Sequence, residues 1–303
     1  MRSPYIQGQI EELKKQSVQA NLFQGAIASL LIPVPPLEEQ ERIVGKLNQI
    51  LPLVDEYEKM EKQLVALKEG FPKILRDALL QAAFKGELSS REEDSPVKDL
   101  MQSIDDERNK MIKEGKYKIN SKLDERESIP YDIPDEWKWT KFGLCTTYGQ
   151  KVMKNAKRDN DSNLWSLDLE DIEKDTGRII KKYRVGERAI NGDRTYFHKG
   201  DLLYSKLRPY LQKMLIADEE GVCSPELIPF QTLGAINKKY VLWLLKSPSV
   251  DYEINSSSYG VKMPRVNTET MINLMVPLPP IEEQERIVEM LDYIIPLCEQ
   301  LLE

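Results

Sequence analysis

Histidine is nearly absent from this chain, which contains one, His198, among 303 residues. A histidine-ligated metal site and a Ser-His or Cys-His catalytic pair need residues that the sequence does not supply. No glycine-rich nucleotide loop follows an expected strand, and the Asn-Pro-Pro-Tyr motif typical of amino-methyltransferases does not occur. The acidic run within residues 134–138 is too compressed to place two carboxylates around a metal ion. We therefore expect a non-catalytic chain without a metal site.

Cysteines and long apolar runs are also scarce. The three cysteines, Cys145, Cys223 and Cys298, have no paired spacing, which favours a reducing compartment over a disulfide framework. The sequence has no charged segment followed by a signal-type apolar run, and no apolar stretch approaches the roughly 20 residues that span a membrane. We expect a cytoplasmic protein that does not contact a membrane.

The negative net charge conceals an uneven distribution. The whole chain carries 43 Lys and Arg against 50 Asp and Glu, a net charge of −7. Between Trp137 and Met275 the counts are 22 against 17. A basic middle between acidic helical flanks suggests one part that meets a polyanion and another that meets protein. Glutamate-rich spacer helices alone would produce the same asymmetry, so charge leaves both interpretations open.

One segment of the chain occurs twice, 244 residues apart. Residues 30–44 read LLIPVPPLEEQERIV and residues 274–288 read LMVPLPPIEEQERIV, with seven consecutive identities starting at Glu38 and Glu282. A proline-rich strap that leads into a charged amphipathic helix, present in two copies, indicates duplication of a large unit. In this register the first 36 residues correspond to the tail of a domain that the chain contains once in full.

Apolar residues after the first strap recur with alternating spacings of three and four. They predict a long helix from Leu37 with a heptad seam, which Pro52 kinks and residues 70–72 (Gly-Phe-Pro) break before it resumes over residues 74–84. A second helix is expected from Val97 to about Lys113. One helix cannot bury its own seam, so we expect the second strap helix and partner helices to cover it. The predicted interface residues are Leu47, Ile50, Val54, Leu64 and Leu67.

From Trp137 onward the pattern changes to short apolar runs with a period of two. Residues 238–246 are expected to form a short buried helix and residues 256–266 a loop, and the four tryptophans are expected in the core. The expected fold class is α+β, with one mixed α/β domain flanked by long helical coiled-coil spacers. The predicted strands are residues 139–144, 178–185, 201–208, 213–217, 227–231 and 272–278.

Six motifs in a fixed order resemble one family, the specificity subunit of type I restriction-modification systems. They are PPLEEQERIV (35–44), AFKGEL (83–88), IPDEWKWTKFG (133–143), KGDLLYSKLRPYLQK (199–213), CSPELIPF (223–230) and SSSYGVKMPRVN (256–267). The chain resembles a half-length or truncated form, because a full subunit carries two recognition domains. The implied boundaries are 1–36 for the tail of a first target-recognition domain, 37–115 for a helical spacer, 116–132 for a linker, 133–280 for the whole recognition domain, and 281–303 for the start of a second spacer.

The resemblance implies a DNA-recognition subunit of a methyltransferase and endonuclease complex. Its recognition domain would read one half of a bipartite site in double-stranded DNA. Its spacer helices would set the half-site distance and dock methyltransferase (modification) subunits, and a motor nuclease (restriction) subunit would join that complex. S-adenosylmethionine and ATP are then expected on partner subunits only, and this chain would need no cofactor. A second copy of the chain or another specificity fragment is a further candidate partner.

Three segments contain the candidate DNA contacts. A cationic stretch suits phosphate contacts, a Tyr-Lys-Arg alternation would share one strand face, and a Ser-, Gly- and Lys-containing loop could enter a groove. Each segment also fits an ordinary solvated surface. The candidates are Lys151, Lys154, Lys157 and Arg158; Tyr204, Lys206 and Arg208; and Ser258, Tyr259, Lys262 and Arg265.

A second function class stays open at this point. A coiled-coil assembly protein with a protein-binding middle domain would also have long amphipathic helices and an acidic isoelectric point, about 5.2 here. The basic balance of the middle segment argues against it. A standalone nuclease lacks any candidate cluster of metal ligands.

Overall fold

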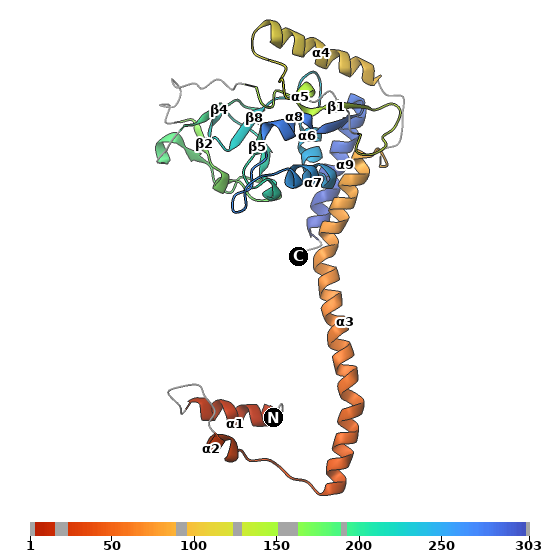
Figure 1. The fold of residues 1–303 in the computed structure, drawn as a ribbon, viewed down its shortest axis with the longest axis vertical. Helices are drawn as coiled ribbons and strands as arrows, with labels where there is room; N and C mark the ends of the chain where they lie inside the picture. Colours follow the sequence, from red (N-terminus) through yellow and green to blue (C-terminus); the bar gives the residue numbers. More distant parts are fainter. Residues whose placement is uncertain are drawn as a thin grey trace. The chain divides into compact units, whose positions relative to one another are not determined.

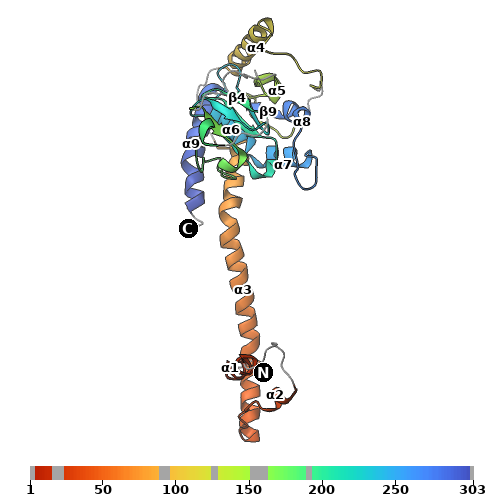
Figure 2. The ribbon, with the colours of Figure 1, turned by 90° about the vertical axis from the view of Figure 1, so that its left-hand side faces the viewer.

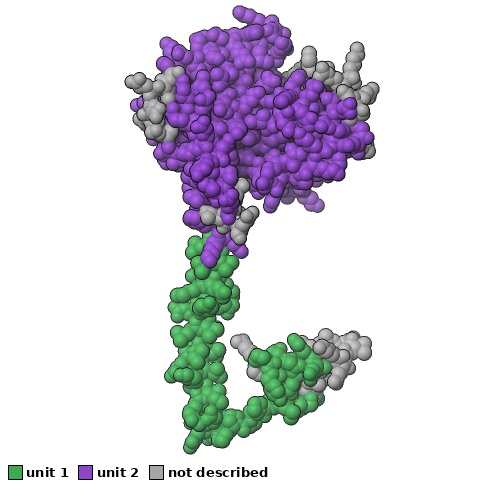
Figure 3. All heavy atoms as spheres, turned by 180° about the vertical axis from the view of Figure 1, so that it is seen from behind, with its two compact units in different colours: residues 1–67 green, residues 68–303 purple. Residues whose placement is uncertain are grey.

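The computed structural model describes residues 4–15, 24–88, 96–123, 129–150, 163–188 and 193–300. It divides into two compact units, residues 1–67 and 68–303 (Figure 3). Unit 1 contains α1 (Pro4–Lys15), α2 (Gln24–Ala28) and the first part of α3 (Leu37–Phe84). Within it the Gln9 side chain donates to the Leu31 carbonyl at 3.2 Å and accepts from the Leu31 amide at 3.0 Å, so α1 holds the start of the strap.

Helix α3 is continuous from Leu37 to Phe84, so the expected break at residues 70–72 is wrong. Pro52 and Pro72 both lie within the helix. Each proline removes one intrahelical hydrogen bond, yet tertiary packing commonly overrides such local costs. Pro72 is buried, and Leu80 and Phe84 anchor the same helix in the core of unit 2. That packing offsets the missing bond, which local sequence rules cannot anticipate.

The described residues of unit 2 form three small sheets. β1 (Lys138–Lys141) pairs antiparallel with β9 (Met275–Leu278), so two segments far apart in the sequence meet in one ribbon. A second sheet has the order β3-β2-β7-β4, and the third, all antiparallel, has the order β6-β5-β8. The remaining strands are β2 (Trp165–Leu167), β3 (Tyr183–Arg184), β4 (Thr195–Phe197), β5 (Leu202–Ser205), β6 (Met214–Ile216), β7 (Gly221–Cys223) and β8 (Leu227–Phe230).

The helices of unit 2 share one hydrophobic core with two of these sheets. Phe84 of α3 packs edge-on against Tyr240 of α6 with ring centroids 5.3 Å apart, and both are fully buried. Leu100 and Ile104 of α4 join the same core. The expected fold class, mixed helix and sheet with a long helix, is confirmed. The helices are α4 (Val97–Lys113), α5 (Phe142–Cys145), α6 (Lys238–Leu245), α7 (Pro248–Ser256), α8 (Thr268–Asn273) and α9 (Ile281–Gln300), with single 3-10 turns at Leu169–Asp171, Val185–Glu187 and Pro209–Leu211.

Helix α9 lies along the last part of α3 and runs in the opposite direction (Figures 1 and 2). Cys298 near its end lines the same pocket as Pro72, and Ile295 lines a second pocket together with Leu80. These two helix segments therefore form an antiparallel pair within unit 2.

The sequence repeat is also a structural repeat. At the offset of 244 residues, α1 matches the position of α7, α2 that of α8, and the start of α3 that of α9. The glutamine of the EEQERIV motif makes the same contact in both copies. Gln40 Nε2 donates to the Pro35 carbonyl at 2.8 Å, and Gln284 Nε2 donates to the Pro279 carbonyl at 3.0 Å. The glutamine therefore joins each strap to the first turn of its helix.

The two copies differ in what covers them. Leu31, Ile32 and Val34 are exposed, whereas their counterparts Met275, Val276 and Leu278 are buried where β9 pairs with β1. The helix shows the same contrast. Ile43, Val44 and Leu47 are exposed, whereas Ile287, Val288 and Leu291 are buried on the α9 face that meets α6.

Several sequence expectations can be compared directly with these elements. The helices at Val97–Lys113 and Lys238–Leu245 are confirmed. The last strand is shorter than expected, because its first two residues end α8 and β9 starts at Met275. Trp137 and Trp165 are buried as expected, whereas Trp139 and Trp243 are only partly buried. Among the described helices, none combines the length and apolar character needed to cross a membrane.

Candidate nucleic-acid interface

A short hairpin loop after α7 is the most distinctive surface feature of unit 2. Tyr259 and Arg265 exchange two backbone hydrogen bonds, each 2.9 Å, and so close a loop of five residues. Gly260 has a φ of +97°, and a Cβ there would lie 3.2 Å from the Met263 carbonyl oxygen. A glycine is therefore needed for the loop to turn in this way. We call residues 259–265 the recognition hairpin, for the role that we propose for it.

The recognition hairpin is fixed to the segment that follows β5. The Arg208 amide donates to the Pro264 carbonyl at 2.7 Å, and the Val266 amide donates to the Lys206 carbonyl at 3.0 Å. Leu207 also forms an isolated antiparallel bridge with Arg265. Residues 56 to 60 positions apart in the sequence are thus paired, and the two segments form one surface.

Glu226 joins the side chains of this surface. Arg265 donates to both Glu226 carboxylate oxygens, at 3.3 and 3.0 Å, and Lys206 Nζ lies 3.9 Å from Oε2. The hydrogen bond to Glu226 raises the pKa of Arg265, which keeps the guanidinium charged. Arg265 is therefore held by the protein and positions the hairpin. Lys262 at the tip is exposed and, within the described ranges, makes no ion pair.

The predicted strand face with Tyr204, Lys206 and Arg208 is wrong. β5 ends at Ser205, and Arg208 adopts a left-handed conformation with a φ of +50° at the start of a 3-10 turn. Tyr204 lies in the core at 2% exposure, and burial raises its phenol pKa well above the ordinary value. The Tyr204 side chain thus does not lie on the surface that Lys206 and Arg208 share. Lys206 and Arg208 remain partly accessible, and the Arg208 Nε is buried without a hydrogen-bond partner.

The other predicted contacts have mixed positions. The Ser258 hydroxyl donates to the Asn255 carbonyl at 2.8 Å, at the end of α7. Tyr259 is exposed at the base of the recognition hairpin. Lys151, Lys154, Lys157 and Arg158 lie outside the described residues. Sequence reasoning missed Glu226, which pairs over a long sequence separation, and it missed the apolar side chains at the hairpin tip.

The predicted interface residues of α3 are all exposed. Leu47, Ile50, Val54, Leu64 and Leu67 have exposed fractions between 42% and 67%. An apolar seam with this exposure has the character of an unfilled coiled-coil surface.

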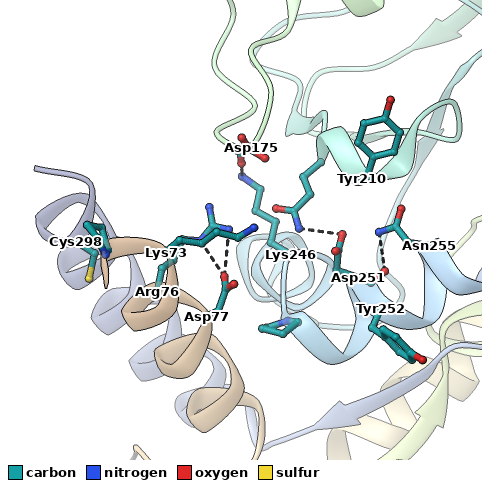
Figure 4. Close-up of a pocket in the computed structure, with 13 residues that line it drawn as sticks. Lys73, Arg76, Asp77, Asp175, Tyr210, Lys246, Asp251, Tyr252, Asn255 and Cys298 are labelled. Atoms are coloured by element: carbon teal, nitrogen blue, oxygen red, sulfur yellow. Dashed lines mark hydrogen bonds and ion pairs between the residues drawn. The ribbon is translucent and has the colours of Figure 1, made fainter. Parts of the chain in front are cut away.

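A pocket of about 490 Å³ lies between α3, α7 and the end of α9 (Figure 4). In it Gln212 Nε2 donates to an Asp251 carboxylate oxygen at 3.0 Å, and Lys246 Nζ donates to two backbone carbonyls at 2.9 Å. Burial raises the pKa of Asp251. Because Asp77, Asp175 and Asp251 line this pocket together with Lys73, Arg76 and Lys246, the lining does not favour a polyanion.

Comparison with known proteins agrees with the motifs. The family model described as the type I restriction modification DNA specificity domain matches residues 4–66 and 171–303. The EcoDI specificity subunit of Escherichia coli is 25% identical over 283 residues, covering 92% of this chain and 58% of that protein. The EcoAI specificity subunit of Escherichia coli is 28% identical over 247 residues, covering 76% of this chain and 40% of that protein. The chain thus spans about half the length of these curated relatives.

Among solved structures, the HsdS subunit from Thermoanaerobacter tengcongensis is 19% identical, with a TM-score of 0.45 over 99% of this chain and 62% of that one. A chain from a structure on the complex assembly of a type I restriction-modification system has a TM-score of 0.49 at 19% identity, over 99% of this chain and 63% of that one. The family model covers more than half of the sequence, and the alternative of a separate coiled-coil assembly protein has no support from these comparisons. The chain belongs to the type I restriction-modification DNA specificity family.

Proposed function

We propose that this chain reads one half of a bipartite DNA target for a type I restriction-modification complex. The observation that carries the proposal is the recognition hairpin, which is fixed to residues 206–208 and forms a surface with an excess of cations. Lys206 and Arg265 share the single carboxylate of Glu226, and Arg208 and Lys262 add two further positive charges. Such a surface suits a phosphate backbone, because counterion release drives binding.

The chain acts without chemistry of its own in this proposal. Methyltransferase subunits methylate the DNA and bind S-adenosylmethionine, a restriction subunit uses ATP, and this chain takes no cofactor. The recognition domain comprises residues 133–280, with a spacer at 37–115, a linker at 116–132, and the flanking segments 1–36 and 281–303. The whole complex works in the cytoplasm on double-stranded DNA.

The spacer helices position the recognition domain. α9 repeats the sequence of residues 37–56 and packs antiparallel on residues 72–84 of α3. The matching part of α3 carries the same apolar residues but leaves them exposed. Residues 37–56 of α3 therefore pair with a second spacer helix in the way that α9 pairs with residues 72–84. That second helix comes from another specificity fragment or from a second copy of this chain. The length of the paired helices sets the half-site distance, and their outer faces dock the methyltransferase.

Duplex binding by the purified chain, with and without its methyltransferase subunits, tests this function. Binding measured by fluorescence anisotropy should weaken as salt rises, with a log–log slope of about −0.9 per neutralised phosphate. Arg208→Gln and Lys262→Gln should each reduce that slope by about one.

Lys116→Gln supplies the matched control, because Lys116 is an exposed lysine paired with Glu114 at 2.7 Å and lies outside the recognition hairpin. It should leave the slope unchanged. Binding that does not respond to salt, or equal effects of all three substitutions, would contradict the proposal.

A further inference from the structure

The tip of the recognition hairpin exposes apolar side chains that the proposed phosphate contacts do not use. Val261 is fully exposed, and Met263 and Tyr259 have exposed fractions of 51% and 58%. The closed hairpin brings these exposed side chains together in one loop, and Lys262 stands between Val261 and Met263 in the sequence.

The apolar tip is held rigidly. Two hydrogen bonds close its base, two more fix it to residues 206–208, and the Arg265–Glu226 contact anchors its last residue. Gly260 supplies the positive φ that this turn requires. A surface held in its binding conformation loses little entropy when it binds, so this rigidity is typical of a contact element.

The surroundings of the tip favour nucleic acid over protein. Cations lie among and beside the apolar residues, with Lys262 between Val261 and Met263 and with Lys206 and Arg208 at the base of the hairpin. A surface that mixes exposed apolar and cationic side chains suits a DNA groove, where phosphates line the edges and bases form the floor. Apolar side chains contact thymine methyl groups in the major groove and base steps in the minor groove.

We propose that Val261 and Met263 contact bases directly and so determine part of the sequence specificity, while Lys262 contacts phosphate. This inference rests on the proposed DNA-reading function and names residues within that surface. It separates two roles on one hairpin. A base contact affects discrimination between sequences, whereas a phosphate contact affects all sequences alike.

The test uses the chain assembled with its methyltransferase subunits, on duplexes built from the target that methylome sequencing defines for the unsubstituted complex. Val261→Ala and Met263→Ala should each lower discrimination at one or two base pairs by about fivefold or more, with the salt slope unchanged. Lys262→Gln should weaken binding equally on target and mismatched duplexes. Because both apolar side chains are largely exposed, thermal unfolding of each variant should match the parent.

The outcomes separate the inference from the function on which it rests. Unchanged discrimination in both apolar variants, with salt-dependent binding intact, would overturn the inference and leave the proposed function standing. Loss of methyltransferase assembly in Val261→Ala would also overturn it, because the tip would then dock protein. Absence of salt-dependent binding in the unsubstituted complex would overturn both.

Discussion

The repeated motif offers a matched pair of substitutions at one sequence position in two environments. Ile43 and Ile287 occupy the same place in EEQERIV, but Ile43 is 44% exposed and Ile287 is fully buried. Truncating a buried isoleucine to alanine costs about 2–5 kcal/mol, through lost transfer free energy and the cavity left behind. On an exposed helix face the same change stays within about 0.5 kcal/mol, and alanine's higher helix propensity offsets part of that loss.

Ile287→Ala should therefore lower the melting temperature of unit 2 by about 6–12 °C, taking about 3 kcal/mol and about 2–4 °C per kcal/mol for a unit of this size. Ile43→Ala should change it by less than about 2 °C. Tryptophan fluorescence follows unit 2, which contains all four tryptophans, and far-UV circular dichroism follows the helices of both units.

Equal losses in the two variants would refute the reasoning, because Ile43 would then be covered in the chain alone. The neighbouring pair gives an internal check. Val288→Ala should destabilise and Val44→Ala should not, since Val288 is 6% exposed and Val44 is 54% exposed.

Three other perturbations test the assembly face, an ion cluster and the thiols. Ile50→Asp should abolish assembly with partner helices, measured by analytical ultracentrifugation, and should leave unit 2 folded. Gln49 is an exposed neighbour outside the seam, so Gln49→Asp, which adds the same charge, should assemble normally. Asp171→Asn should cost about 1.5–3 kcal/mol in denaturant unfolding, because the buried Asp171 carboxylate accepts from Arg188 at 2.6 and 2.7 Å and an amide can accept only one of these two bonds. Glu170→Gln, at an 80% exposed side chain 3.5 Å from Arg188, should cost less than about 0.5 kcal/mol. Burial raises the pKa of the Cys145 and Cys223 thiols to about 12, so both thiols should stay protonated at pH 8. They should resist a thiol reagent until urea exposes them. Rapid labelling of Cys145 and Cys223 in the native chain would show that these two thiols are accessible to solvent.

The repeat and the long helix could be predicted because their signals are local. Seven identical residues and a three-four apolar spacing are visible without any knowledge of contacts. Tyr204 could not be placed in this way. β5 is the central strand of its sheet, and all four of its residues are buried. The alternation of polar and apolar residues in the sequence therefore did not indicate which side chains of this strand are exposed.

The hairpin was recognisable as a loop from its serines and glycine, but its organisation was not. Glu226 holds Arg265 across 39 residues of sequence, and no local pattern signals such a pair. Val261 and Met263 are residue types that usually mark a core. Their exposure depends on the closure of the hairpin by Tyr259 and Arg265, which is a tertiary feature.

The two copies of EEQERIV separate the motif into a part that folds locally and a part that depends on a neighbour. The glutamine makes its strap contact in both copies, although one helix face is covered and the other is not. The isoleucine and valine are buried only in the copy whose helix packs against α6. Gln40→Ala should therefore fray the start of α3, seen as reduced hydrogen-exchange protection at Glu39 and Gln40, and should leave the exposed seam able to assemble. Loss of assembly together with protection would show that the strap and the seam act as one element.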